Sequence, residues 1–217
     1  MDYKFLTTTL LFRGTTEAEA KEMLVCLGAR EKQYAKGATI YHAGEPVESM
    51  GLVLSGSALI EMSDLWGNST VLDCAAAGQL FAETYACIPS EPLMVSVKAN
   101  EACSVLFLNA ARLMSACQNS CAHHARLIQN LLQISAQKNL TLSRRSIHTA
   151  PKTIRGRLLS YLSEQAKQQG GYHFTIPYDR QQLADYLGVD RSALSNELSK
   201  MQRDGLLTYK KSTFSLK

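Results

Sequence analysis

The chain has 217 residues, enough for one large core or two modest domains. Hydrophobic residues make up 46% of it, which predicts a packed interior. No apolar run approaches the roughly 18 residues that a membrane helix needs, so we expect no membrane partner. The start, Met1-Asp2-Tyr3-Lys4, lacks the basic region and apolar stretch of a signal peptide. We therefore expect a cytoplasmic protein whose six cysteines are free thiols.

The net charge of +4 is unevenly distributed. Residues 151–217 carry 11 Lys and Arg against 6 Asp and Glu, whereas residues 1–150 carry 12 against 13. A basic excess confined to the last third of the chain is typical of a polyanion-binding domain, although an ordinary solvated face gives the same balance.

The first elements form a short helix followed by a β-rich region. Residues 15–28 are predicted to be helical, with Thr15 or Thr16 as the cap and Glu17 and Glu19 in the first turn. From about residue 37, short apolar runs alternate with glycine-containing turns, a pattern of a sandwich or barrel. The predicted strands are Ala38–His42, Gly51–Leu54, Ala58–Met62, Thr70–Cys74, Met94–Val97 and Cys103–Leu108.

A long helix is predicted over residues 110–147, which contain neither Pro nor Gly. It is longer than one small domain needs, so its apolar stripe is a candidate seam for a two-stranded coiled coil. Packing against the chain's own strands is the alternative. The predicted dimerisation residues are Leu127, Ile128, Leu131, Ile134 and Leu142.

Ala150-Pro151 marks a predicted hinge, after which a second domain begins. An amphipathic helix, the strand His173–Ile176 and a final hairpin flank two further helical segments. The helical segments are Arg180–Leu187 and Arg191–Arg203, and the hairpin pairs Leu206–Tyr209 with Thr213–Leu216.

These two segments have the spacing of a helix-turn-helix. Ala184 is small enough to face the partner helix, and Gly188 permits the left-handed conformation that a tight turn needs. Val189 fills the angle between the helices, and Asp190 caps the second helix. A plain helical hairpin with solvated polar residues is the alternative.

The second helix presents polar side chains on its outer face near its N-terminus, where a recognition helix meets base edges in the major groove. Flanking cations would contact phosphates. The predicted base contacts are Arg191, Ser192, Ser195 and Asn196, and the predicted phosphate contacts are Arg180, Lys210 and Lys211.

With these residues the chain resembles the Crp/Fnr superfamily of transcription regulators. Further motifs of the resemblance are Leu54-Ser55-Gly56-Ser57-Ala58 and Gly78-Gln79-Leu80-Phe81-Ala82-Glu83. It implies an α+β fold in three parts: a double-stranded, jelly-roll-like β-roll sensor (residues 1–109), a dimerisation helix (110–148) and a winged helix-turn-helix (149–217).

The resemblance also implies partners and site residues. It predicts a homodimer on double-stranded DNA with a two-fold symmetric site, and RNA polymerase as a further partner. Arg191 matches the position of a base-reading Arg in members that respond to cyclic AMP, and Ser195 matches a Ser of the oxygen-sensing branch. Ser192 and Asn196, by contrast, replace a common Glu and a frequent second Arg. The half-site can therefore differ from the usual one.

The sensor departs from the members that bind cyclic AMP. Their Arg-Ser pair, which holds the cyclic phosphate, corresponds to Leu93 and Met94. A buried phosphate without a cation is strongly disfavoured, so we predict a small hydrophobic or aromatic effector instead, or none. The predicted pocket residues are Glu83, Tyr85, Cys87, Leu93 and Met94.

No metal, other cofactor or catalytic group is predicted. Only Cys26 lies where the oxygen-sensing branch clusters its iron–sulfur ligands. Cys117, Cys121, His123 and His124 could form a metal site or a thiol switch, but buried thiols and exposed histidines explain them as well. A regulatory ligand-binding module would not need the recognition helix. A cupin-type metalloenzyme would need more strand histidines than His42.

Overall fold

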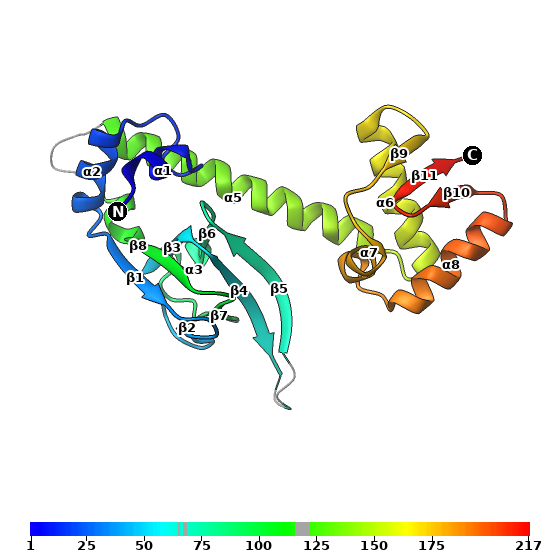
Figure 1. The fold of residues 1–217 in the computed structure, drawn as a ribbon, viewed down its shortest axis with the longest axis horizontal. Helices are drawn as coiled ribbons and strands as arrows, with labels where there is room; N and C mark the ends of the chain where they lie inside the picture. The colour runs from blue at the N-terminus through cyan, green and yellow to red at the C-terminus, as the bar shows by residue number, and fades with distance from the viewer. Residues whose placement is uncertain (65, 67–68, 116–121) are drawn as a thin grey trace. The chain divides into compact units, whose positions relative to one another are not determined.

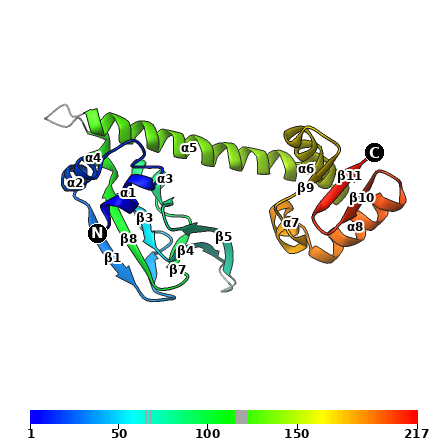
Figure 2. The same ribbon diagram turned by 45° about the horizontal axis from the view of Figure 1, so that its top comes forward.

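The computed structural model describes residues 1–64, 66, 69–115 and 122–217. The chain divides into two compact units, residues 1–136 and 137–217. Figures 1 and 2 show the β-rich first unit and the smaller second unit from two directions.

Two four-stranded antiparallel sheets form the first unit, and both draw on strands from far apart in the sequence. Their orders are β1-β8-β3-β6 and β2-β7-β4-β5. This interleaving confirms the predicted β-roll. The strands are β1 (Arg30–Tyr34), β2 (Thr39–Tyr41), β3 (Ser49–Ser55), β4 (Ser57–Ser63), β5 (Ser69–Ala76), β6 (Leu80–Phe81), β7 (Ser96–Ala99) and β8 (Cys103–Asn109).

Aromatic rings occupy part of the roll's interior. Tyr41 lies edge-to-face with both Phe81 and Phe107, at centroid distances of 6.2 and 5.6 Å. The Tyr41 hydroxyl donates to the Ser49 carbonyl (2.8 Å), and burial raises its pKa to about 12. Gly51 has no side chain because the Phe81 ring lies where a Cβ would be.

Helices cover the roll, and their caps follow the sequence. Thr16 and Glu19 form a reciprocal capping box at the start of α2, as the Thr-x-x-Glu spacing predicts. The prediction of a single helix over residues 110–147 is wrong, because α4 ends at Met114, the backbone of Ser115 is extended, and α5 begins at residue 122. These helices are α1 (Tyr3–Thr8), α2 (Glu17–Cys26), α3 (Glu83–Cys87), α4 (Ala110–Met114) and α5 (Ala122–Thr149).

The second unit is a winged helix-turn-helix that also includes the end of α5. Its small sheet has the order β10-β11-β9, and its core contains residues from all three following helices. None of the helices described in either unit combines the length and apolar character needed to cross a bilayer. The elements are α6 (Ile154–Gln169), β9 (His173–Thr175), α7 (Arg180–Leu187), α8 (Arg191–Arg203), β10 (Leu207–Lys210) and β11 (Thr213–Leu216).

Candidate nucleic-acid interface

The first helix of the helix-turn-helix, α7, is closed at both ends. The Asp179 carboxylate accepts from the Gln182 N–H (2.8 Å), while the Gln182 side chain accepts from the Asp179 N–H (2.9 Å). The helix ends at Gly188 in the left-handed conformation (φ 62°, ψ 47°). The observed start and end of α7 confirm the predicted helix Arg180–Leu187. Each end is set by a local residue, the start by the Asp179 cap and the end by Gly188.

The second helix, α8, begins at the Asp190 cap. The Asp190 carboxylate accepts from the Ser192 hydroxyl (2.5 Å) and from the Ala193 N–H (2.8 Å). These hydrogen bonds hold the pKa of Asp190 below its ordinary value. On the inner face, Leu194 and Leu198 are completely buried, as is Ala184 on α7. This packing fixes the angle between the two helices, as the spacing of small and apolar residues predicts.

The outer face of α8 carries the four predicted base contacts. The side chains of Arg191 and Asn196 are exposed, and within the described chain neither has a hydrogen-bonding or ionic partner. The Ser192 hydroxyl donates to Asp190, and that of Ser195 donates to the Arg191 carbonyl (2.9 Å). Arg191 and Asn196 therefore have free donors, while the serines need only rotate to offer theirs.

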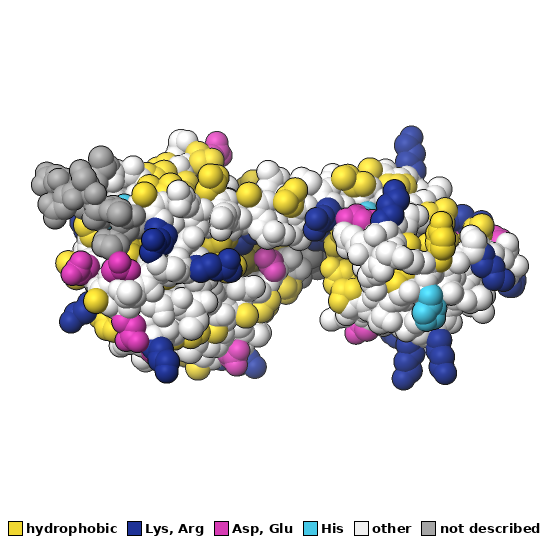
Figure 3. Space-filling view, turned by 90° about the horizontal axis from the view of Figure 1, so that it is seen from above, with side chains coloured by type: hydrophobic (Ala, Val, Ile, Leu, Met, Phe, Trp, Pro, Cys, Tyr) yellow, Lys and Arg dark blue, Asp and Glu magenta, His cyan; other side chains and the backbone are white. Residues whose placement is uncertain are grey.

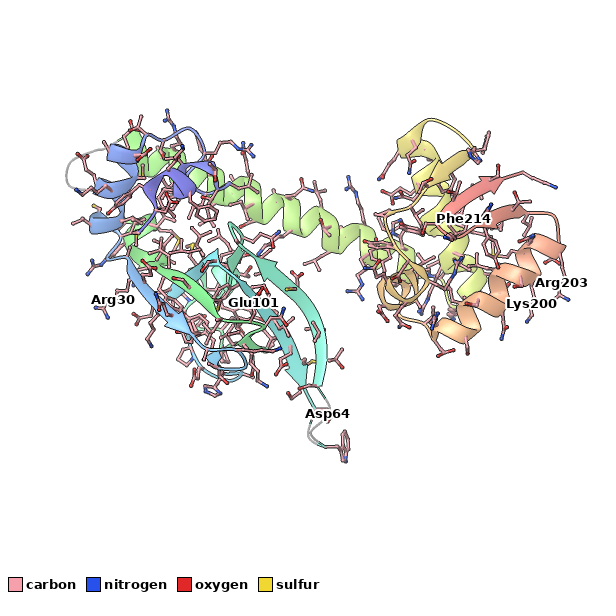
Figure 4. All side chains as sticks on the ribbon, viewed as in Figure 1. Arg30, Asp64, Glu101, Lys200, Arg203 and Phe214 are labelled. Atoms are coloured by element: carbon pink, nitrogen blue, oxygen red, sulfur yellow. The ribbon has the colours of Figure 1, made fainter. Side chains whose placement is uncertain are left out.

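Two cations on α8 were not among the predicted contacts. Lys200 and Arg203 are exposed on its C-terminal half (Figure 4). The sequence does indicate Lys200 as a further contact, because it follows Asn196 by four residues and thus lies on the same face of the helix. Lys and Arg side chains also stand out elsewhere from the surface of this unit in Figure 3.

The wing is the turn between β10 and β11, where Lys210 is paired with Thr213. Lys210 and Lys211 are exposed at this turn, as the predicted phosphate contacts require. Arg180, the third predicted phosphate contact, lies with its guanidinium over the Tyr209 ring (5.0 Å to the centroid). It also donates to the Lys211 carbonyl (3.1 Å), so its phosphate contact stays a prediction.

Two arginines bind the C-terminal carbonyls of α7. Arg145, near the end of α5, donates to the carbonyls of Asp185 (2.9 Å) and Tyr186 (3.1 Å). Arg157, on α6, donates to those of Leu187 (2.9 Å) and Gly188 (3.1 Å). Cations suit this end of a helix, where unpaired carbonyls concentrate negative charge. The turn of the helix-turn-helix is thereby tied to both neighbouring helices.

A buried histidine adds to this attachment. His148 on α5 is 2% exposed; its Nδ1 lies 2.8 Å from the Tyr186 hydroxyl and its Nε2 lies 2.5 Å from the Glu164 carboxylate. Its ring also packs edge-to-face against Tyr161. No pattern in the sequence indicates this cluster, because its members come from three helices.

Comparisons with known proteins agree with this geometry. Residues 31–120 match the family model of the cyclic nucleotide-binding domain, and residues 156–217 match the Crp-like helix-turn-helix domain. The chain belongs to the Crp/Fnr family of transcription regulators. This is a family of regulators rather than enzymes, and the helix-turn-helix is its DNA-binding domain.

Individual relatives of this Crp/Fnr regulator are distant. The CRP-like protein Clp of Xanthomonas euvesicatoria pv. vesicatoria is 23% identical over 184 residues, covering 82% of this chain and 80% of its own. The catabolite activator protein of Thermus thermophilus has the same fold with a TM-score of 0.54 (22% identical, 96% and 94% covered). CprK in complex with OCPA has the same fold with a TM-score of 0.64; it is 19% identical, and the match covers 90% of this chain and 91% of CprK.

The predicted effector residues of this regulator lie in different surroundings. Leu93 is 2% exposed, whereas Met94 is 75% exposed. Glu83 is buried at the start of α3, and Tyr85 and Cys87 are half-buried on the same helix. Burial raises the pKa of the Cys87 thiol, with Glu83 as a smaller cause. Cys87 packs against the core that contains α2 and α5, not against the aromatic interior of the roll.

The predicted dimerisation residues separate into two groups. Leu127 and Leu131 are buried in the unit's own core, with Ile134 packed against it. Ile128 and Leu142 are exposed. Of the possible metal ligands, Cys117 and Cys121 lie outside the described residues, and the side chain of His124 is buried.

Proposed function

We propose that this Crp/Fnr regulator binds a two-fold symmetric double-stranded DNA site as a homodimer, with α8 in the major groove. Arg191, Ser192, Ser195 and Asn196 contact base edges. Lys210 and Lys211 contact phosphates. The observation that carries this proposal is the outer face of α8, where the exposed side chains of Arg191 and Asn196, which have no partner among the described residues, flank hydroxyl groups close to the helix N-terminus.

The proposed dimer seam is an exposed stripe on α5. Ile128, Leu132 and Leu142 are 41, 68 and 66% exposed, and their spacing of four and ten residues places them on one helix face. That spacing fits alternating core positions of a two-stranded coiled coil. Leu127 and Leu131, on the adjacent face of the helix, pack α5 onto its own unit.

The proposed effector is a small hydrophobic or aromatic molecule rather than cyclic AMP. Relatives differ in what they bind: the CLP of Xanthomonas campestris is described as c-di-GMP responsive, and CprK is seen with OCPA. In this chain, the place of the phosphate-binding pair is taken by buried Leu93 and exposed Met94, neither of which can balance a phosphate charge. The proposal further includes RNA polymerase as a partner and a cytoplasmic location, since transcription takes place there in bacteria.

Selection of binding sites tests the DNA part of this proposal. The full-length chain is incubated with a random duplex library, and bound duplexes are amplified and sequenced over several rounds. We expect an inverted repeat whose half-site centres are about 10–10.5 base pairs, or a multiple of this, apart. Recovery of unrelated sequences only would contradict sequence-specific binding.

Sedimentation of α5 variants tests the seam. Leu132→Glu and Leu142→Glu should each shift the chain from dimer to monomer, because a charge in an apolar seam loses its hydration. Leu140→Glu is the matched control: Leu140 is 52% exposed but lies about a third of a turn away from the stripe. Equal dissociation by all three variants, or by none, would contradict the seam.

A further inference from the structure

Arg180 is held by the wing on two sides. Its guanidinium lies 5.0 Å from the Tyr209 ring centroid and 5.9 Å from that of Phe214, which is completely buried. One of its arms donates to the Lys211 carbonyl at 3.1 Å. Burial lowers the pKa of Arg180, as expected for a cation withdrawn partly from water. The side chain thus connects the start of α7 to both strands of the wing.

The wing turn needs such support. Lys211 has a φ of +54°, a left-handed conformation that residues with a side chain rarely adopt. Such a conformation persists where surrounding contacts impose it. Arg180 holds the Lys211 carbonyl, and Ser212 is fixed from the other side, where its hydroxyl donates to the Tyr178 carbonyl (3.0 Å) and its carbonyl accepts from the Ile176 N–H (2.9 Å).

The free cations of the wing lie at this braced turn. The ammonium groups of Lys210 and Lys211 are exposed, and within the described residues they have no ionic partner. A phosphate contact is useful only if the turn that carries it has a fixed direction, because a mobile turn must be ordered on binding. Among the cations near the wing, Arg180 is thus the one whose donors and ring contacts are directed into the protein.

We propose that Arg180 is a positioning residue: it sets the direction of the wing turn so that Lys210 and Lys211 meet DNA phosphates, and it does not itself bind a phosphate. This inference rests on the proposed DNA binding. It assigns to Arg180 a different role from the direct contact that the sequence predicts.

A double-mutant cycle separates the two roles. Binding of the full-length chain to its selected duplex is measured by fluorescence anisotropy over a range of salt concentrations. The variants are Arg180→Ala, the pair Lys210→Ala with Lys211→Ala, and all three together. We expect Arg180→Ala to weaken binding on the order of fivefold in the wild-type background. In the background without the two lysines it should have less than about a twofold effect, because the groups that it positions are gone.

Each result of the cycle has a defined meaning. One result would show direct phosphate binding by Arg180 and overturn the inference. The affinity losses would be additive in the triple variant, and the slope of log affinity against log salt concentration would fall in magnitude by a further increment of about 0.9 for each phosphate that the protein no longer neutralises. No effect of Arg180→Ala in either background would overturn it too. If the wild-type chain selects no duplex, the proposed function fails and this inference fails with it; the additive outcome refutes the inference alone.

Hydrogen exchange without DNA provides a second measurement in case Arg180→Ala unfolds the domain. Arg180→Lys keeps the charge but loses the planar guanidinium that can stack and donate at once. We expect faster amide exchange at residues 210–213 in this variant and unchanged exchange in α8. Wild-type protection of the wing in Arg180→Lys, together with wild-type DNA affinity, would overturn the positioning role.

Discussion

The two units of the chain use positive charge in different ways. In the winged-helix unit, Arg145, Arg157 and Arg180 each bind backbone carbonyls of another element. The side chains of Arg191 and the wing lysines are exposed and have no partner in the part of the chain that the structure describes. In the β-roll unit, we assign Leu93 and Met94, both hydrophobic, to the two positions of the phosphate-binding pair that the family resemblance implies for members that bind cyclic AMP. On this comparison rests our proposal that the winged-helix unit meets a polyanion and that the β-roll unit does not enclose a cyclic phosphate.

A network around α8 illustrates how the winged-helix unit holds its free cations in place. The Arg155 guanidinium on α6 contacts the carboxylates of Glu197 (2.6 Å) and Asp204 (2.7 Å). These hydrogen bonds, that to Glu197 first, raise the pKa of Arg155 above its ordinary value. Arg155 is 37% exposed, so solvent screens these ion pairs and their value is chiefly geometric. Together with the buried leucines, they fix the direction in which α8 presents its outer face.

The largest expected effect tests whether the two units have separate cores. Leu198→Ala should lower the free energy of unfolding of residues 137–217 by about 2–5 kcal/mol, because it leaves a cavity at a completely buried position. Peptide-resolved hydrogen exchange should show faster exchange in α6–α8 and unchanged exchange in β3 and β8.

The matched control is Leu106→Ala, which is equally buried but lies in the β-roll unit. It should accelerate exchange in the β-roll and leave α7 and α8 protected. If either substitution destabilised both units to the same extent, the comparison of two separately built regions would be wrong.

A smaller effect is expected at the turn of the helix-turn-helix. Gly188 has a φ of +62°, and Arg157 is the nearest group, at 3.7 Å from a Cβ built there. Gly188→Ala should thus cost roughly 1–2 kcal/mol through backbone conformation alone, as measured by denaturant unfolding. Gly205→Ala, at φ +76° with open space around it, should cost a similar amount. Only Gly188→Ala should also reduce the preference for the selected duplex over random DNA; equal preference in both variants would contradict a role of this turn in aligning α8.

A modest pH effect is expected at the cap of α8. The Ser192 hydroxyl and then the Ala193 N–H lower the pKa of Asp190 below its ordinary value of 3.8. Because the folded pKa is depressed, the cap's stabilisation is present above pH 3.8 and is lost as the pH falls through the folded value. An NMR titration of the carboxyl group should show its midpoint rising in Ser192→Ala and unchanged in Ser195→Ala; no difference between the variants would contradict the assigned cause.

The smallest expected effect is the absence of a response to cyclic AMP. Millimolar cyclic AMP should not raise the melting temperature of the full-length chain, since ligand stabilisation requires binding to the folded state. A screen of small apolar and aromatic compounds in the same assay is the positive arm. Stabilisation by cyclic AMP and by none of the apolar compounds would contradict the claim that the β-roll unit does not enclose a cyclic phosphate.

Local signals made the winged-helix unit predictable. The bounds of α7 and α8 follow from Asp179, Gly188 and Asp190, whose caps depend only on neighbouring residues. By contrast, β1 was not predicted, because its residues Arg30–Tyr34 show no alternation and four of the five are exposed. It is a strand because it pairs with β8, more than 60 residues away in the sequence.

The candidate site likewise contains residues whose surroundings the sequence predicts and a residue whose surroundings it does not predict. The exposure of Arg191 and Asn196 follows from helical periodicity, which the sequence contains. The engagement of Arg180 with the wing depends on Tyr209, Phe214 and Lys211, which tertiary structure brings to it. The break after α4 was also missed, because no Pro or Gly marks the extended Ser115.

Fluorescence anisotropy of Arg191→Ala on the selected duplex and on random DNA tests sequence-specific recognition by α8 most directly. Removal of a base-reading side chain should weaken binding to the selected duplex by roughly 1–3 kcal/mol and leave binding to random DNA nearly unchanged. Arg203→Ala, which removes a cation farther along the same helix, should weaken binding to both duplexes alike. Equal weakening on both duplexes by Arg191→Ala, or wild-type binding to the selected duplex, would contradict the account.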